Sequence, residues 1–203
     1  MAELKIPILS FKEVAAIEAY MIREPAESNG FWLKLSKIGA PETTISKDEA
    51  IEAALCCGWI DGQLAKFDEH HFLVRMTPRR SGSRWSAKNR GTAERLAREG
   101  RLKAVGLGQI EQAKADGRWD AAYQSQGKAE VPSDLLAALA RNAKAAHFFE
   151  TLDRANRYAV IYRVNDAKRR ETRSKRIAQY VDMLARGETI HPQKSAKGRP
   201  RPS

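Results

Sequence analysis

The sequence predicts an α+β fold, in which a small antiparallel three-stranded sheet is packed by helices and followed by a mainly helical C-terminal half. Apolar and polar residues alternate in three segments, 30–36, 59–67 and 72–76, as they do in half-buried strands. A short polar turn separates the last two segments, which predicts an antiparallel hairpin. From about residue 104 onward only helical patterns occur.

Two capping-box patterns mark the starts of the first helices. Ser10 precedes Glu13 by three residues, and Ser46 precedes Glu49 in the same way. We expect the second of these helices to begin after Ser46 and to end at Gly58, where the next strand follows at once. The remaining expected helices span 11–24, 87–99, 104–116, 133–141, 143–151, 153–166 and 168–186.

The length of 203 residues predicts one domain, which we place at residues 1–187. A helical subdomain from about residue 104 is the alternative. The segment 188–203 is basic overall and rich in Pro, Ser and Lys, a composition that predicts a disordered tail. The chain has no apolar run of the ~18 residues that a membrane span needs, and it shows no export signal. Its two cysteines are adjacent in sequence and cannot link distant parts of the fold by a disulfide, so we expect the protein in the reducing cytoplasm.

Positive charge is concentrated in three places. The chain carries 36 Lys and Arg against 25 Asp and Glu, and the basic excess falls in 79–103, 168–176 and 191–203. Such patches attract anionic small molecules or nucleic acid, which are the partners we expect. The alternative is that each patch is only the solvated face of a helix.

The segment Cys56–Gly62 could carry chemistry because two glycines bracket a tryptophan and a carboxylate. If the strand alternates strictly, Trp59 and Asp61 share one face and Ile60 points into the core. Trp59 could then form an apolar wall for a ligand, and Asp61 is the candidate catalytic acid or base. The competing interpretation is that Trp59 packs in the core and Asp61 pairs with an arginine.

The segment Thr77–Asn89 supplies the groups that suit an anion. The candidate ligand-binding residues share donor groups or stacking surfaces, and they are Trp59, Asp61, Arg79, Arg80, Arg84, Trp85 and Asn89. Guanidinium groups bind carboxylate or phosphate through two parallel hydrogen bonds, and the following helix offers its positive end. The alternative is again internal, with an arginine paired to Asp61 and Trp85 in the core.

The familiar catalytic and cofactor motifs are absent from the sequence. It lacks the phosphate-binding loop, the nucleophile elbow, the zinc-protease motif and the dinucleotide fingerprint. Cys56 and Cys57 have no second cysteine pair, so we expect buried small side chains and no metal site. We expect no cofactor, and whether the protein is an enzyme stays open.

The motifs Cys-Gly-Trp-Ile-Asp-Gly, Thr-Pro-Arg-Arg and Ser-x-Trp-Ser-x-x-Asn resemble those of the YdeI/OmpD-associated family, also labelled bacteriocin-protection proteins. The similarity extends over roughly residues 30–187. The resemblance implies a role in resistance to antimicrobial peptides and an envelope association, and it carries no agreed enzymatic activity. The lack of an export signal departs from an envelope location.

These observations lead to three hypotheses about function. The first is a noncatalytic binder of an anionic ligand, acting in stress or antimicrobial-peptide resistance. The second is a small enzyme that uses Asp61 as general acid or base, with arginine stabilising the developing charge. The third is a nonspecific nucleic-acid-binding protein that uses residues 168–176 and the basic tail.

Overall fold

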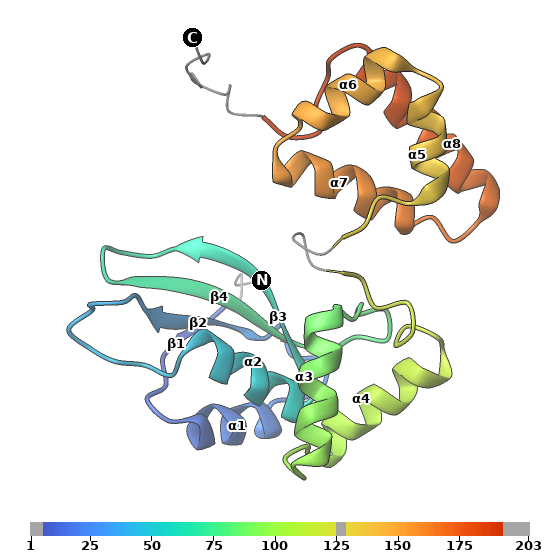
Figure 1. Cartoon of the computed structure of the whole chain (residues 1–203). Coiled ribbons are helices and arrows are strands. Elements are labelled where there is room, and N and C mark those ends of the chain that lie inside the picture. The colour runs from blue at the N-terminus through green and yellow to red at the C-terminus, as the bar shows by residue number, and fades with distance from the viewer. Residues whose placement is uncertain (1–5, 125–128, 193–203) are drawn as a thin grey trace, which may run out of the picture. The chain divides into compact units, whose positions relative to one another are not determined.

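The computed structural model describes residues 6–124 and 129–192, and its contacts divide the chain into two compact units (Figure 1). Unit 1 is Met1–Tyr123 and unit 2 is Gln124–Ser203. The division lies about one helix later than the helical subdomain expected from residue 104. In the part of the chain that the structure describes, no helix is both long enough and apolar enough to cross a membrane.

Unit 1 contains a mixed four-stranded sheet, which has one more strand than the sequence predicted. Its strands are β1 (Ile8–Leu9), β2 (Phe31–Ser36), β3 (Trp59–Lys66) and β4 (His71–Pro78), in the order β1-β2-β4-β3. The three long strands pair antiparallel, as predicted. The prediction of a wholly antiparallel, three-stranded sheet was wrong because β1 pairs parallel with β2. A two-residue strand is too short to show the alternation by which strands are recognised.

The helices of unit 1 begin and end close to where their sequence signals predict. They are α1 (Val14–Arg23), α2 (Lys47–Cys56), α3 (Ala87–Arg98) and α4 (Ala104–Ala115). At the start of α2 the capping box is confirmed, because Ser46 Oγ accepts from the Glu49 amide while the Glu49 carboxylate accepts from the Ser46 amide. The Ser10 capping box was wrong: α1 begins at Val14, and Ser10 Oγ instead donates to the Lys34 carbonyl.

The core of unit 1 lies between the sheet and the helices α1 and α2, which are on the same side of the sheet (Figure 1). Phe31, Leu33 and Leu35 alternate along β2 and are all buried on this side. Helix α4 packs closely on the end of α2, since a Cβ atom at Gly106 would lie 2.5 Å from the Cys56 carbonyl oxygen. This close approach explains why α4 belongs to unit 1.

Unit 2 is helical in the part that the structure describes. Its helices are α5 (Ser133–Ala140), α6 (Ala143–Thr151), α7 (Arg154–Asn165) and α8 (Arg170–Ala185). Asn142 and Asp153 cap α6 and α7 with their side-chain oxygens, which accounts for the short connections between these helices. Their apolar faces form a separate core of Leu135, Leu139, Ala145, Phe149, Leu152, Val160, Ile161, Val164, Ile177, Tyr180 and Leu184.

The segment after α8 is held against unit 2 at its beginning. Arg186 pairs with Glu188 at 2.9 Å, and the backbone of His191 is hydrogen-bonded to the side chain of Asn156. Residues 188–192, which the sequence assigns to a disordered tail, therefore make specific contacts. The rest of the predicted tail, 193–203, lies outside the described residues.

Candidate functional site

The two segments singled out by the sequence lie side by side, because β3 begins where β4 ends. Trp59 is paired with Pro78, and Ile60 with Thr77. The contact continues past the strand, where the Arg79 amide donates to the Gly58 carbonyl at 3.0 Å. The hairpin thus brings the Trp59–Asp61 segment next to the arginine-rich loop that follows β4.

Trp59 lies in the core of unit 1. Its side chain is 3% exposed, its ring lies 5.6 Å from that of Phe31, and its Nε1 donates to the Met21 carbonyl of α1 at 3.2 Å. Ile60 is only half-buried, so the expectation that Ile60 points into the core and Trp59 does not was wrong. The reason is that α1 and α2 cover the face of the sheet that carries Trp59.

Arg79 is the most unusual of the candidate residues, because its guanidinium is buried without a carboxylate. The residue is 5% exposed, and its Cζ lies 3.7 Å from the centre of the Trp85 ring. Nη1 donates to the Arg84 carbonyl at 3.3 Å, whereas Nε and Nη2 are buried and have no hydrogen-bond partner among residues 6–124 and 129–192. Within the described residues, Arg79 forms no ion pair. Burial lowers the pKa of Arg79 to about 10, and the charge of Asp61 partly opposes this effect.

Trp119 and Arg118 lie beside this pair, and we call Arg79, Trp85, Arg118 and Trp119 the arginine–tryptophan cluster. The rings of Trp85 and Trp119 meet edge to face at 4.8 Å, and Trp85 is 2% exposed. Trp85 Nε1 is buried and has no acceptor in the part of the chain that the structure describes. Arg118 donates to the Ser83 carbonyl at 2.9 Å and pairs with Asp116 at 2.7 Å.

The sequence interpretation included neither Arg118 nor Trp119 in the site. A signal was available, because Arg118-Trp119 repeats the Arg84-Trp85 dipeptide of the loop. The backbone near the second dipeptide is hydrogen-bonded to the loop, because the Tyr123 amide donates to the Trp85 carbonyl at 3.0 Å. This pairing connects segments almost 40 residues apart and could not be read from local pattern.

The other predicted arginines form an outer layer of the site. Arg80 is exposed and donates to the carbonyls of Glu27 and Ser28, at 3.4 and 3.2 Å, in the turn after α1. Arg84 is also exposed. Asn89 is half-buried at the start of α3, where its amide donates to the Ser86 cap at 3.0 Å. The predicted residues of the segment Thr77–Asn89 therefore form a buried pair, Arg79 and Trp85, and an outer layer of exposed Arg80 and Arg84 with half-buried Asn89.

Asp61 lies beside a bulge in β3. The register of the β3–β4 pair shifts between Asp61 and Leu64, and Gly62 at the shift leaves room beside Arg75. The Asp61 side chain is half-buried and makes no ion pair or hydrogen bond with the described residues. Its charge nevertheless reaches Arg79, whose pKa it raises against the effect of burial. A catalytic role for Asp61 stays a prediction.

The two cysteines are free thiols buried in the core of unit 1. Burial raises the pKa of Cys56, and it raises the pKa of Cys57 to about 12, with a smaller contribution from Glu18. Such thiols are poor nucleophiles, because the reactive form is the thiolate. Among the described residues, no group of three or more His, Cys, Asp and Glu side chains is arranged to hold a metal ion.

Comparison with protein families divides the chain in nearly the same place as its structure does. Residues 9–109 match the model described as Domain of unknown function (DUF8412), and residues 128–187 match Bacteriocin-protection, YdeI or OmpD-Associated. The second match covers less of the chain than the resemblance from residue 30 implied, and the arginine loop falls within the first. No curated protein and no solved structure matches the chain. The chain thus carries, in residues 128–187, a domain of the YdeI/OmpD-associated (bacteriocin-protection) family.

Proposed function

We propose that the protein is a noncatalytic binder of an anionic ligand, and that the arginine–tryptophan cluster is its anion site. One observation carries the proposal: the Arg79 guanidinium is buried, yet two of its nitrogens have no acceptor among the residues that the structure describes. A buried charge without a partner is costly, and native proteins pair or hydrogen-bond almost all such groups. An anion that accepts from Nε and Nη2 would satisfy both donors at once.

The donors of the cluster suit a carboxylate or a phosphate. Nε and Nη2 lie on one edge of the guanidinium and match two oxygens of a planar or tetrahedral anion. Trp85 Nε1, on the ring that stacks with Arg79, is a further buried donor without an acceptor. Hydrogen bonds to a charged acceptor in such a setting contribute about 1.5–3 kcal/mol each.

A ligand would reach Arg79 past the loop of residues 80–84. The loop folds back so that the Arg84 carbonyl accepts from Arg79, and its turn is closed by the Ser83 amide, which donates to the Arg80 carbonyl at 2.9 Å. A Cβ atom at Gly82 would meet nothing within 4 Å, so the tip of the turn is unobstructed. The exposed Arg80 and Arg84 would attract the anion to this entrance.

The match of residues 128–187 to a bacteriocin-protection description supports a wider role in resistance to antimicrobial peptides, and we extend the proposal to a role in stress. A small anionic metabolite or an anionic group on a larger partner would be bound in that context. The free thiols of Cys56 and Cys57 favour a reducing compartment, and we place the activity in the cytoplasm.

The proposal is tested by titrating inorganic phosphate, pyrophosphate and citrate into the full chain, with isothermal calorimetry at two salt concentrations. We expect at least one of these anions to bind, and Arg79→Met to weaken that binding at least tenfold. Arg98→Met is the matched control, since Arg98 is an exposed arginine of α3 outside the cluster. Binding that survives Arg79→Met, or that falls equally in Arg98→Met, would show that surface charge alone attracts these anions.

A further inference from the structure

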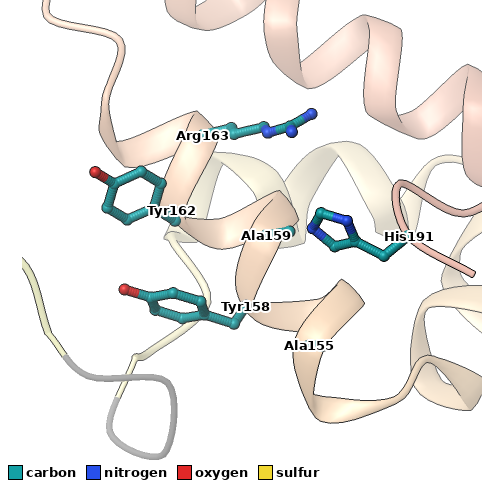
Figure 2. Close-up of a pocket in the computed structure, with 6 residues that line it drawn as sticks. All are labelled: Ala155, Tyr158, Ala159, Tyr162, Arg163 and His191. Atoms are coloured by element: carbon teal, nitrogen blue, oxygen red, sulfur yellow. The ribbon is translucent and has the colours of Figure 1, made fainter. Parts of the chain in front are cut away.

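Unit 2 contains a groove along α7 that none of the site residues above contributes to. The groove has a volume of about 400 Å³ and is lined by Ala155, Tyr158, Ala159, Tyr162, Arg163 and His191. Figure 2 shows the two tyrosine rings side by side on α7, with the His191 ring pointing toward Ala159 from the segment after α8. The space suits a single small ligand or one residue of a polymer.

The tyrosines provide flat aromatic surfaces one helical turn apart. Their ring centres are 5.7 Å apart with planes inclined by 40°, and both side chains are half-buried. The Tyr158 hydroxyl donates to the Gln124 carbonyl at 3.0 Å, which fixes the direction of its ring. Ala155 and Ala159 recur at the same spacing on α7, and their small side chains leave the groove open beside the rings.

The groove favours an anion rather than a cation. Its lining includes Arg163 and His191 and no carboxylate. Arg163 is exposed, and its guanidinium forms no ion pair with the described residues. The surrounding residues 129–192 carry twelve Lys and Arg against eight Asp and Glu, so the wider field has the same sign.

The position of His191 is fixed by a buried amide. Asn156 is 1% exposed, its Oδ1 accepts from the His191 amide at 2.9 Å, and its Nδ2 donates to the His191 carbonyl at 3.2 Å. The two bonds use both the N–H and the C=O of His191 and hold its backbone against α7. The backbone of His191 is therefore held in place beside the groove, and its ring can serve as a hydrogen-bonding group there.

From these features we propose that the groove binds a nucleobase together with its phosphate. A base stacks on Tyr158 or Tyr162, and Arg163 neutralises the phosphate. Aromatic stacking surfaces beside positive charge are the means by which proteins bind single-stranded nucleic acid without reading its sequence. A free nucleotide presents the same base and phosphate, and the experiment distinguishes the two sources.

The test uses the full chain and two probes, a fluorescein-labelled oligothymidylate of about 15 nucleotides, which spans typical site sizes, and thymidine monophosphate. We expect Tyr162→Ala to weaken oligonucleotide binding, measured by fluorescence anisotropy, about tenfold. Tyr162→Phe keeps the ring and is expected to stay within about twofold of the wild type. Arg163→Ala is expected to weaken binding and to reduce its dependence on salt.

The control is Arg141→Ala, which removes the same charge from an exposed position outside the groove. Shifts of the groove residues with the mononucleotide in NMR spectra would assign the site to free nucleotides, and shifts with the oligonucleotide alone would assign it to single strands. The proposal is overturned if Tyr162→Ala binds like the wild type, or if Arg141→Ala loses as much affinity as Arg163→Ala. Equal binding of inorganic polyphosphate, which has no bases, would overturn it as well.

Discussion

The guanidinium of Arg79 stacks on the indole of Trp85 at 3.7 Å, and both side chains are buried, with no carboxylate of the described residues paired to the guanidinium. Stacking on an aromatic ring compensates only part of what a guanidinium loses when it leaves water. The arrangement therefore costs stability in the free protein and provides donors for a ligand. Removing the charge of Arg79 should therefore increase stability and weaken anion binding.

Replacing Arg79 with methionine removes the buried charge while keeping a long side chain against Trp85. We expect Arg79→Met to raise the free energy of unfolding by about 1–2 kcal/mol, because apolar replacements of buried charges are often stabilising. Arg98→Met, at an exposed position, is expected to change it by less than about 0.5 kcal/mol. Urea denaturation measures both. A loss of stability in Arg79→Met would mean that the guanidinium stabilises the fold and is not an unsatisfied donor that a ligand would pair.

Two glycines of α4 provide a matched pair for the packing of unit 1. A Cβ atom at Gly106 would lie 2.5 and 2.6 Å from the carbonyl oxygens of Cys56 and Leu55, whereas at Gly108 nothing lies within 4 Å. We expect Gly106→Ala to destabilise the protein by about 2 kcal/mol, because it pushes α4 away from α2. Gly108→Ala should stabilise it by up to about 1 kcal/mol through helix propensity. Equal effects of the two substitutions in thermal denaturation would contradict this close packing.

The burial of Cys57 predicts that its alkylation rate differs between the folded and the unfolded protein. With the pKa of Cys57 raised to about 12, this thiol stays protonated at pH 9, whereas an unfolded cysteine, with a pKa near 8.5, is largely ionised. We expect iodoacetamide to modify Cys57 at least about 100-fold faster in guanidinium chloride than in the native protein, measured by mass spectrometry at pH 9. Because the folded state holds the proton more tightly, stability should fall as pH rises above about 8.5. Similar native and unfolded rates would refute the burial of this thiol.

The Asn156 amide predicts local rather than global unfolding of the segment after α8. Asn156→Ala removes both hydrogen bonds to the His191 backbone, so we expect faster hydrogen exchange at residues 189–191 and a loss of about 1–2 kcal/mol in the local stability of this segment. His191→Ala keeps the backbone bonds and is the control, with exchange in this segment unchanged. If both variants exchange alike, Asn156 does not hold the segment.

Much of the fold was predictable because its signals are local. The helix that starts at Ser46 was recognisable from its capping box, and its end was recognisable from Gly58, which adopts a φ of +73°. The strand β1 was not, since its two residues acquire their conformation only by pairing with β2. The Ser10 prediction was wrong for a related reason. A cap motif is only a local preference, and the Ser10 hydroxyl donates instead to the Lys34 carbonyl of β2.

The candidate site was predictable in its position and less so in its arrangement. The hairpin pattern was enough to place Trp59 near Arg79. Alternation distinguishes the two faces of a strand but does not say which face the helices cover, so Trp59 and Ile60 were assigned to the wrong sides. The repeated Arg-Trp dipeptide pointed to Arg118, but its contact with the loop depends on long-range pairing, which a single sequence does not reveal.

The most direct test of the anion site follows the indole N–H signals of the four tryptophans by NMR while phosphate or citrate is added to the full chain. We expect the signal of Trp85 to shift and saturate, because its Nε1 is a buried donor that lacks an acceptor within the described residues. The signal of Trp59 should stay in place, because its N–H already donates to the Met21 carbonyl. A Trp85 signal that does not move at anion concentrations that saturate binding measured by calorimetry would contradict the assignment of the anion site to the arginine–tryptophan cluster.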